Sequence, residues 1–248
     1  MLSVIELERA LASLGLEAPV RFDEVTGSTS TTAAELAEAG APEWSLVAAG
    51  HQTAGRGRLG RVWSDVPGAA LMFSFVLRPS LDPEDAGLIP LLAGASMATA
   101  IDDVARIQVR CKWPNDLLVD GGKVGGILTE SSVTGGRVRH VVVGIGVNLE
   151  RPMGVEASAG LGHSDPGTLL VAFLRRFHEG YLRLPEGVVD DWSAVSATLG
   201  RDVEVRRLHG PPIRGRAMAV DERGALMIRT LNGTRTVASG EVEHLGSV

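Results

Sequence analysis

Gly50–Trp63, with the sequence GHQTAGRGRLGRVW, is the stretch from which the rest of the chain can be interpreted. Three glycines alternate there with three arginines, which are Gly55, Arg56, Gly57, Arg58, Gly60 and Arg61. Glycine lets a backbone approach a ligand closely, and each arginine adds a planar fork of donors that suits a carboxylate or a phosphate. Because such a segment does not fill a core, we expect a surface loop that is mobile when empty and ordered around an anion. A solvated basic hairpin tip is the alternative.

The composition is that of an ordinary globular protein, with 44% hydrophobic and 22% charged residues in a chain of 248. This length predicts one or two domains with ample core. No apolar run approaches the ~18 residues of a membrane span and no signal peptide opens the sequence, so we expect a cytoplasmic protein without a membrane partner. The single cysteine, Cys111, excludes an internal disulfide and a cysteine-based zinc cluster. A net charge of −6 argues against a general nucleic-acid binder.

Lysine is almost absent, since Lys112 and Lys123 are the only two among the 24 Lys and Arg residues. Coding bias accounts for a general preference for arginine. Both remaining lysines lie beside segments rich in glycine or proline. We interpret them as positions where a compact ammonium group is needed and a guanidinium does not replace it.

Apolar periodicity predicts an α+β domain followed by a smaller β domain. Helices are expected at 3–14, 33–40, 83–105, 168–184 and 186–197. Strands are expected at 20–25, 46–50, 69–78, 107–113, 117–119, 123–133 and 137–147. After Gly200 the pattern changes to short strands separated by turn residues, at 203–208, 213–220, 225–230 and 234–239. We therefore expect a larger domain at 1–199 and a barrel-type β domain at 200–248.

Several common site motifs are missing from the sequence. Neither lysine is followed by Ser or Thr as in a Walker phosphate loop, no dinucleotide fingerprint is present, and G-x-S-x-G does not occur. The six histidines show no metal-ligand spacing, so we predict no metal-binding residues. What remains is a group of polar residues at strand ends and turns, namely Ser28, Thr29, Ser30, Gln52, Arg56, Arg58, Arg61, Trp63, Lys112, Asn115, Asp116, Lys123 and Asn148.

Two features of this group suggest chemistry. The hydroxyl run Thr26–Thr32 precedes a helix, and one of its side chains is expected to cap that helix, which leaves others to bind a polar, uncharged ligand group. Asp116 and Lys123 lie on either side of the Gly121-Gly122 turn, where antiparallel pairing brings them within reach. For this second feature the alternative is a surface ion pair worth ~0–1 kcal/mol.

Four motifs in one order, GRGRLGRVW, KWPNDLL, GGKVGGILTE and GIGVNLE, resemble those of the biotin protein ligases. Upstream of them, GSTS is similar to the Ser-Thr-Asn ligand motif of that family. The resemblance covers residues 25–150, and the small C-terminal β domain also fits. It implies an α+β fold with a mixed β-sheet flanked by helices, related to class II aminoacyl-tRNA synthetases, and a small C-terminal SH3-like β-barrel.

The resemblance also implies a reaction. Biotin and ATP, with Mg²⁺, would give biotinyl-5′-AMP and pyrophosphate, and the biotinyl group would pass to one lysine of a biotin carboxyl carrier protein. Members of the family that also repress transcription carry a winged helix-turn-helix before the Ser-Thr-Asn motif. Only about 25 residues precede that motif here, too few for an independent DNA-binding domain, so we expect a ligase that does not bind DNA. A homodimer is left open.

The same resemblance implies a set of ligand contacts. They are Ser28, Thr29, Ser30, Gln52, Gly55, Arg56, Gly57, Arg58, Trp63, Lys112, Asn115, Lys123, Gly125 and Asn148. Ser28, Thr29 and Gln52 match residues that hold the ureido ring of biotin. Trp63 matches a residue that covers the nucleotide, and Asn148 one that contacts adenine.

Catalytic roles are implied for Arg58, Asp116 and Lys123. Arg58 belongs to the loop that closes over the biotin carboxylate and the α-phosphate. Lys123 matches the lysine beside these two reacting groups, and Asp116 is its expected partner. Ser30 departs from the pattern, because the family usually has Asn at that position, so a contact between Ser30 and biotin stays open.

Elementary chemistry agrees with these roles. Joining two anions requires cations that suppress their repulsion, and Arg56, Arg58, Lys123 and Mg²⁺ supply them. The neutral ureido group needs donors and acceptors, which the hydroxyls and Gln52 offer. Because every residue matched to the ureido ring precedes residue 60, we expect the C-terminal domain to assist acceptor transfer or ATP positioning and to contribute little to biotin binding.

Two other functions remain open from the sequence. A lipoate or octanoate ligase shares the fold and a lysine of the same type, although GRGRLGRVW and KWPND favour biotin. A non-catalytic biotin-binding corepressor module is the second, and it would have no use for the pair Asp116 and Lys123.

Overall fold

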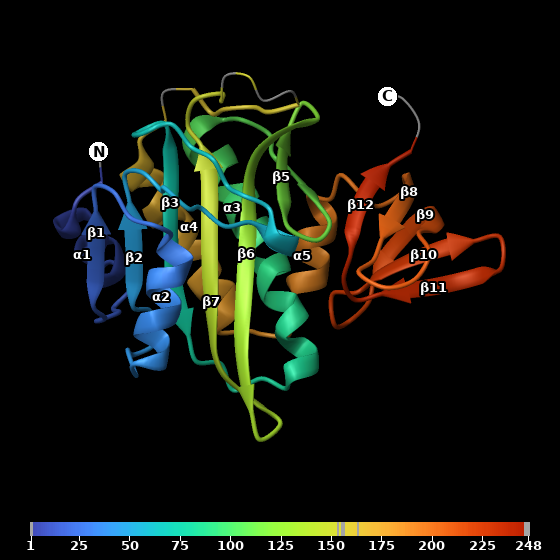
Figure 1. Cartoon of the computed structure of the whole chain (residues 1–248), viewed down its shortest axis with the longest axis horizontal. Coiled ribbons are helices and arrows are strands. Elements are labelled where there is room, and N and C mark those ends of the chain that lie inside the picture. The colour runs from blue at the N-terminus through green and yellow to red at the C-terminus, as the bar shows by residue number, and fades with distance from the viewer. Residues whose placement is uncertain (1, 153, 155–156, 163, 246–248) are drawn as a thin grey trace.

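The computed structural model describes residues 2–152, 154, 157–162 and 164–245. Within them a seven-stranded mixed sheet has the order β1-β2-β3-β7-β6-β5-β4, in which β1 pairs with β2 in parallel and the other neighbours are antiparallel (Figure 1). Its strands are β1 Val20–Asp23, β2 Leu46–Ala49, β3 Ala70–Leu77, β4 Arg110–Lys112, β5 Asp116–Val119, β6 Gly122–Thr134 and β7 Arg137–Asn148.

Helices pack on both faces of this sheet. The larger core is formed with α1 Val4–Ala12, α3 Leu88–Ala105, α4 Pro166–Tyr181 and α5 Val188–Ala194. Helix α2, Thr29–Glu38, lies in front of β3 and beside β7 in Figure 1 and packs on the opposite face.

Successive side chains of β3 point to opposite faces of the sheet and therefore pack against different helices. Phe73 and Phe75 are fully buried in the larger core. The intervening side chains point the other way, so Val76 packs against Ala33 and Ala37 of α2. This second face, beneath the beginning of α2, is the one that carries polar and glycine positions, and it is where a site has room to form.

An aromatic cluster fixes α4 to the sheet. Phe75 stacks on Trp44 with ring centroids 5.8 Å apart and meets Phe177 edge-to-face at 5.2 Å. Phe177 also lies 5.6 Å from Phe173 one turn earlier on the same helix. Such offset and edge-to-face pairs add stability beyond the area that they bury.

The C-terminal part is a separate five-stranded antiparallel sheet in the order β11-β10-β9-β8-β12. Its strands are β8 Asp202–Arg206, β9 Ile213–Val220, β10 Leu226–Thr230, β11 Gly233–Val237 and β12 Glu241–His244. The four strands expected there are confirmed, whereas β12 was not predicted, because its four residues, EVEH, include only one apolar side chain. The α+β class, with a mixed sheet flanked by helices and a small C-terminal β domain, is confirmed.

The two sheets are joined by buried contacts rather than by a linker alone. Trp113 donates its indole N–H to the carbonyl of Gly224 at 3.0 Å and its backbone N–H to Thr198 Oγ1 at 3.0 Å. A single hydrophobic cluster includes Phe73 of the large sheet and Leu226 of the small one. The pocket described below therefore has walls from both parts.

Two expected helices differ from the structure. The helix expected at 33–40 begins earlier, at Thr29, since part of the hydroxyl run forms its first turn. Ser28 occupies the N-cap position, but its side chain makes no capping hydrogen bond, so the expected cap is not found there. Residues 83–105 form a 3₁₀ turn, Pro83–Gly87, followed by α3, and Pro90 does not interrupt α3 because it lies in the first turn.

The segment Pro83–Ala105 is the one helical stretch in the described part of the chain that is long and apolar enough to cross a membrane. Its sequence has no uninterrupted apolar run of that length, because charged residues lie near both ends, at Glu84, Asp85, Asp102 and Asp103. In the structure 67% of its apolar window is buried inside the protein, as in a core helix.

Phe177→Ala tests the aromatic cluster. The side chain is fully buried, and removing a buried phenylalanine leaves a cavity, so we expect the free energy of unfolding to fall by about 3–5 kcal/mol. Denaturant titration measures it, with Leu182→Ala as a control because Leu182 is exposed and should change stability by less than about 0.5 kcal/mol. Equal effects of both substitutions would contradict this packing.

His244 links stability to pH at the junction of the two sheets. Burial, followed by the charges of Lys112 and Arg201, lowers the pKa of His244 from 6.5 to about 4. The unfolded chain then binds a proton in this range that the folded protein does not, so His244 makes stability fall as pH drops from about 6.5 to about 4. We expect His244→Gln to reduce that fall, measured by denaturant titration across the range. His209→Gln is the control, since His209 is exposed, and identical pH profiles for both variants would disprove the assignment.

Candidate active site

A pocket opens on the face of the large sheet that α2 covers. Its walls come from the first turn of α2, the turn between β4 and β5, the middle of β6 and β7, and the start of β12. The segment Gly50–Trp63, called the Gly/Arg loop below, forms a further wall. Twelve of the residues predicted from the sequence line it, which are Ser28, Thr29, Ser30, Gln52, Arg56, Gly57, Arg58, Trp63, Lys112, Asn115, Asp116 and Lys123. The structure thus brings together four separate segments of the chain, which are 28–30, 52–63, 112–116 and Lys123.

Three predicted residues do not line this pocket. Gly55 is packed against the loop backbone, where a Cβ would lie 2.4 Å from the carbonyl oxygen of Trp63. Gly125 faces the carbonyl of Gly146 in the neighbouring strand, at 2.7 Å from the position of a Cβ. Asn148 donates to the carbonyl of Ala159 at 3.2 Å. Ligand contacts by Gly55, Gly125 and Asn148 remain predictions.

The floor of the pocket is made by glycine on β7. A Cβ at Gly144 would lie 2.2 Å from Ser30 Oγ, and one at Gly146 would lie 2.7 Å from the indole ring of Trp63. No side chain fits at either position without moving these groups. Both glycines belong to the motif GIGVNLE. Their positions in the sequence do not reveal that one lies beneath α2 and the other beneath Trp63.

One end of the pocket is neutral and rich in hydroxyls. Ser28, Thr29 and Ser30 are buried there at the beginning of α2. Gln52 turns toward them, and its Oε1 accepts from the backbone N–H of Thr29 at 2.7 Å. This hydrogen bond uses one of the free N–H groups at the helix start, a position that Ser28 does not cap. The neutral end suits an uncharged polar group that has both donors and acceptors.

The other end is cationic. Lys123 Nζ lies 2.5 Å from Asp116 Oδ1, so the predicted pair forms across the β5–β6 hairpin. Arg56 pairs with Glu130 of β6. Burial lowers the pKa of Arg58 from its usual value, while the charges of Asp116 and Glu241 act in the opposite direction. Arg58 and Lys123 therefore lie close together around Asn115 and Asp116, whereas Arg56 pairs further along β6.

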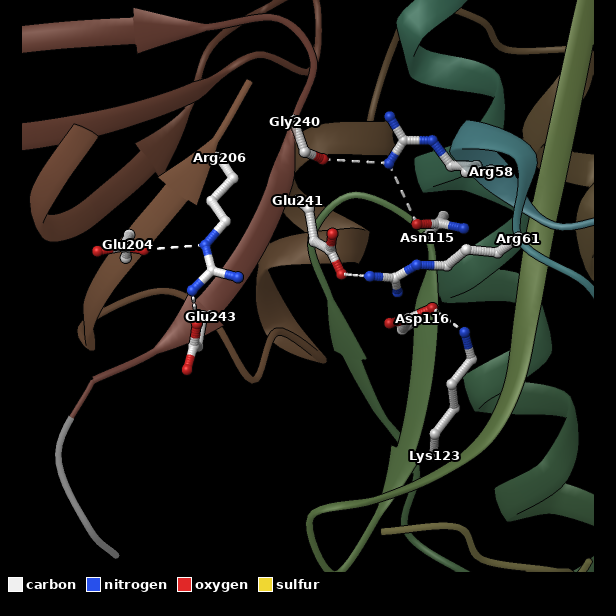
Figure 2. A network of polar contacts seen from close by, with 10 residues as sticks. All are labelled: Arg58, Arg61, Asn115, Asp116, Lys123, Glu204, Arg206, Gly240, Glu241 and Glu243. Carbon is white, nitrogen blue, oxygen red and sulfur yellow. Dashed lines mark hydrogen bonds and ion pairs between the residues drawn. The ribbon is translucent and has the colours of Figure 1, made fainter. Parts of the chain in front are cut away.

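The C-terminal sheet contacts the Gly/Arg loop directly. Arg58 donates from Nη1 to the carbonyl of Gly240 and to Asn115 Oδ1, both at 3.3 Å (Figure 2). Arg61 pairs with Glu241 at the start of β12. In Figure 2 this strand runs alongside the loop, and the Asp116–Lys123 pair lies just below.

Sequence reasoning missed the residues that complete the site from a distance. Glu241 comes from the unpredicted strand β12, and Glu130, the last residue of GGKVGGILTE, was assigned no role. Ser74 of β3 contacts the hydroxyl end from behind, yet in the sequence it is only a small residue inside an apolar strand. Neighbouring residues in the sequence do not indicate these roles, because each role depends on a tertiary contact that exists only in the folded protein.

No group of three or more His, Cys, Asp or Glu side chains within the described residues is arranged to hold a metal ion. Magnesium usually binds through substrate phosphates, waters and one or two carboxylates, so its entry with a nucleotide is compatible with this donor set. Cys111 is not a candidate nucleophile, since burial raises the pKa of its thiol to about 12.

Comparison with known proteins assigns both parts of the chain. The family model described as "Biotin/lipoate A/B protein ligase family" matches residues 22–148, and "Biotin protein ligase C terminal domain" matches residues 198–245. The bifunctional ligase/repressor BirA of Bacillus subtilis strain 168 is 32% identical over 237 residues, covering 90% of this chain and 73% of that protein.

Two further similarities extend over nearly the whole chain. The biotin–[acetyl-CoA-carboxylase] ligase of Paracoccus denitrificans is 33% identical over 239 residues, or 88% of this chain and 97% of that protein. The biotin protein ligase from Aquifex aeolicus in complex with biotin and ATP aligns with a TM-score of 0.75 and 28% identity, covering 92% of this chain and 99% of that one. The chain therefore belongs to the biotin/lipoate A/B protein ligase family and, within it, to the biotin protein ligases.

Proposed function

We propose that this protein joins biotin to ATP, releasing pyrophosphate, and then transfers the biotinyl group from biotinyl-5′-AMP to one lysine of a biotin carboxyl carrier protein. The observation that supports this most is the composition of the pocket, which combines neutral hydroxyls and an amide with the cations Arg56, Arg58 and Lys123. Biotin has groups that complement both, a neutral ureido ring and a carboxylate. The relative from Paracoccus denitrificans bears the name of such a ligase, and the Aquifex aeolicus enzyme was solved with biotin and ATP.

In the first step an oxygen of the biotin carboxylate attacks the α-phosphorus of ATP, and the bond to the β-phosphate oxygen breaks. Both reacting groups are anions, so cations that hold them in line lower the barrier. We assign this work to Arg58 and Lys123, with Mg²⁺ entering as part of the MgATP substrate. Asp116 accepts a hydrogen bond from Lys123 and keeps its ammonium group oriented.

In the second step the amine of the acceptor lysine attacks the carbonyl carbon of the mixed anhydride, and AMP leaves. The intermediate is sensitive to water, so the Gly/Arg loop and Trp63 have a further role in covering it. The Trp63 ring already lies over Gly146 at the pocket floor. Arg61 and Arg58 connect the loop to the start of β12.

Two alternatives are separable by experiment. A lipoate or octanoate ligase shares the family described for residues 22–148, but the match of residues 198–245 is to a domain of biotin protein ligases. Thermal shift with biotin against lipoate distinguishes the two. A non-catalytic biotin-binding corepressor would bind biotin without biotin-dependent exchange of pyrophosphate into ATP, so that exchange assay is the direct test of the proposal.

Several expectations remain part of this proposal. They are the division at 1–199 and 200–248, the cytoplasmic location, the absence of DNA binding and the open question of a homodimer.

The continuous core across the two sheets argues for testing the C-terminal domain by point substitution, because truncation at 199 would expose Trp113 and its neighbours.

Lys123→Gln and Lys123→Arg should cripple adenylate formation and largely spare biotin binding. Losing one preorganised charge contact at a developing anion costs about 2.7–4 kcal/mol, or about 10²–10³ in rate. A guanidinium keeps the charge but fixes a different geometry, which is why the arginine variant should fail as well. Single-turnover adenylate formation and biotin calorimetry measure the two quantities.

Arg137→Gln is the control for this experiment, because Arg137 is exposed at the far end of β7. The contradicting result is a Lys123→Arg variant that forms adenylate at a rate within about threefold of the parent, a difference of less than about 1 kcal/mol in activation free energy. Lys123 would then be a structural partner of Asp116 only.

Arg61→Gln and Glu241→Gln test how much the C-terminal sheet contributes to biotin binding. The pair is largely solvent-exposed, with 63% and 38% of the two side chains accessible, and exposed pairs contribute ~0–1 kcal/mol. We therefore expect the biotin Kd to rise by less than about fivefold in each variant and in the double variant. A tenfold loss in any of them would show that the C-terminal sheet has a substantial part in biotin binding.

A further inference from the structure

Ser74 lies behind the hydroxyl end of the pocket and connects its side chains. It is fully buried on β3, on the sheet face beneath α2, and it does not line the pocket. Its Oγ is 2.8 Å from Thr29 Oγ1 and 3.1 Å from Ser30 Oγ. Thr29 Oγ1 in turn lies 3.2 Å from Gln52 Oε1. Four side chains thus form one chain of hydrogen bonds, Ser30–Ser74–Thr29–Gln52.

The direction of this chain is fixed at the Gln52 end. The backbone N–H of Thr29 points at the Gln52 side-chain amide from 2.7 Å, so the atom that faces it must be the oxygen. The amide nitrogen then faces Met72 Sδ, to which it donates at 3.3 Å. Gln52 Oε1 has no proton to give, and it can only accept.

Each hydroxyl has one proton, and the acceptor at Gln52 sets where each proton goes. Thr29 donates to Gln52, so it must accept from Ser74. Ser74 has then used its proton and must accept from Ser30. The order of donation is Ser30 to Ser74, Ser74 to Thr29, and Thr29 to Gln52.

Ser30 therefore turns its proton away from the pocket. Ser30 lines the pocket and Ser74 does not, so the side of Ser30 Oγ that faces a ligand carries lone pairs. The space around this oxygen is confined, because a Cβ at Gly144 would lie only 2.2 Å from it. A buried acceptor of this kind requires a ligand N–H or O–H, since a buried lone pair without a partner is unfavourable.

We propose that Ser30 is a specificity residue that accepts a hydrogen bond from one ureido N–H of biotin, and that Ser74 is the positioning residue that makes it an acceptor. The proposal rests on the function proposed above and assigns a role to the position where the sequence departs from the family's usual Asn. An Asn side chain offers its own carbonyl oxygen. Serine has one oxygen that can donate or accept, so it needs Ser74 to fix its direction.

The test uses three ligands and calorimetry. The ligands are biotin and its two mono-N-methyl derivatives, in which one ureido N–H at a time is replaced by N–CH₃. The variants are Ser30→Ala and Ser74→Ala, and Thr31→Ala is the control because Thr31 is exposed on the same turn of α2. The quantity compared is the ratio of the Kd of each methyl derivative to the Kd of biotin. Each ratio is measured within one variant, so a loss of folded protein cancels.

In the parent and in Thr31→Ala, we expect methylation of the N–H that Ser30 accepts to weaken binding about tenfold or more. In Ser30→Ala biotin itself should bind about tenfold more weakly, and the penalty for that one methyl group should fall below about threefold, while the penalty for the other methyl group stays. Ser74→Ala should likewise weaken biotin binding and reduce the penalty for the methyl group on the N–H that Ser30 accepts. The reason is that the Ser30 proton is released and can turn into the pocket.

Two results overturn the proposal. One is that Ser30→Ala binds biotin within about twofold of the parent affinity and keeps both methyl penalties. Ser30 would then only pack against β7. The other is that Ser74→Ala lowers every affinity by one common factor, which is what a purely structural role predicts. Failure of the proposed function is distinct, since the parent would then neither bind biotin nor exchange pyrophosphate.

Discussion

Gly144 and Gly146 keep one face of β7 free of side chains, and the pocket depends on the space that results. With a Cβ at either position, Ser30 or the ring of Trp63 would have to move. The same two residues let α2 and the Gly/Arg loop approach one face of the sheet side by side. Neutral hydroxyls and charged groups thereby meet over one strand, although they come from distant segments of the chain. A side chain at this point would separate the two ends of the site.

Carboxylates accompany several of the cations that line the pocket, while Arg58 donates instead to Asn115 and to the carbonyl of Gly240. Arg56 has Glu130, Lys123 has Asp116, and Arg61 has Glu241. Repulsion among the cations is reduced by these carboxylates, which allows several positive groups to lie close together at a partly buried position. An incoming anion then exchanges with carboxylates or shares their partners. The binding free energy is consequently smaller than the number of charges suggests, and the gain can be concentrated where charge develops during reaction.

Local rules explain which features the sequence could reveal. The Asp116–Lys123 pair follows from a hairpin, and the strands follow from alternation of apolar residues, so both could be predicted. The Arg61–Glu241 pair joins residues from two sheets, and Ser74 gains its role only when α2 is laid across β3. Nothing near these positions in the sequence encodes such contacts. The expected side-chain cap is not made by Ser28, and the backbone N–H of Thr29 at the helix start is bound instead by Gln52, which is distant in the sequence.

The single hydrophobic cluster that runs from the large sheet into the small one has a thermodynamic consequence. With Trp113 anchored to Gly224 across the junction, the two sheets should lose structure in one cooperative transition rather than in two. A ligand in the pocket would then protect the distant strands of the small sheet against amide hydrogen exchange as well as those that it touches. By mass action this protection amounts to about 2.7 kcal/mol at a ligand concentration of about a hundred times the Kd. Occupancy of the pocket is thus communicated to the outer edge of the small sheet without any change of shape.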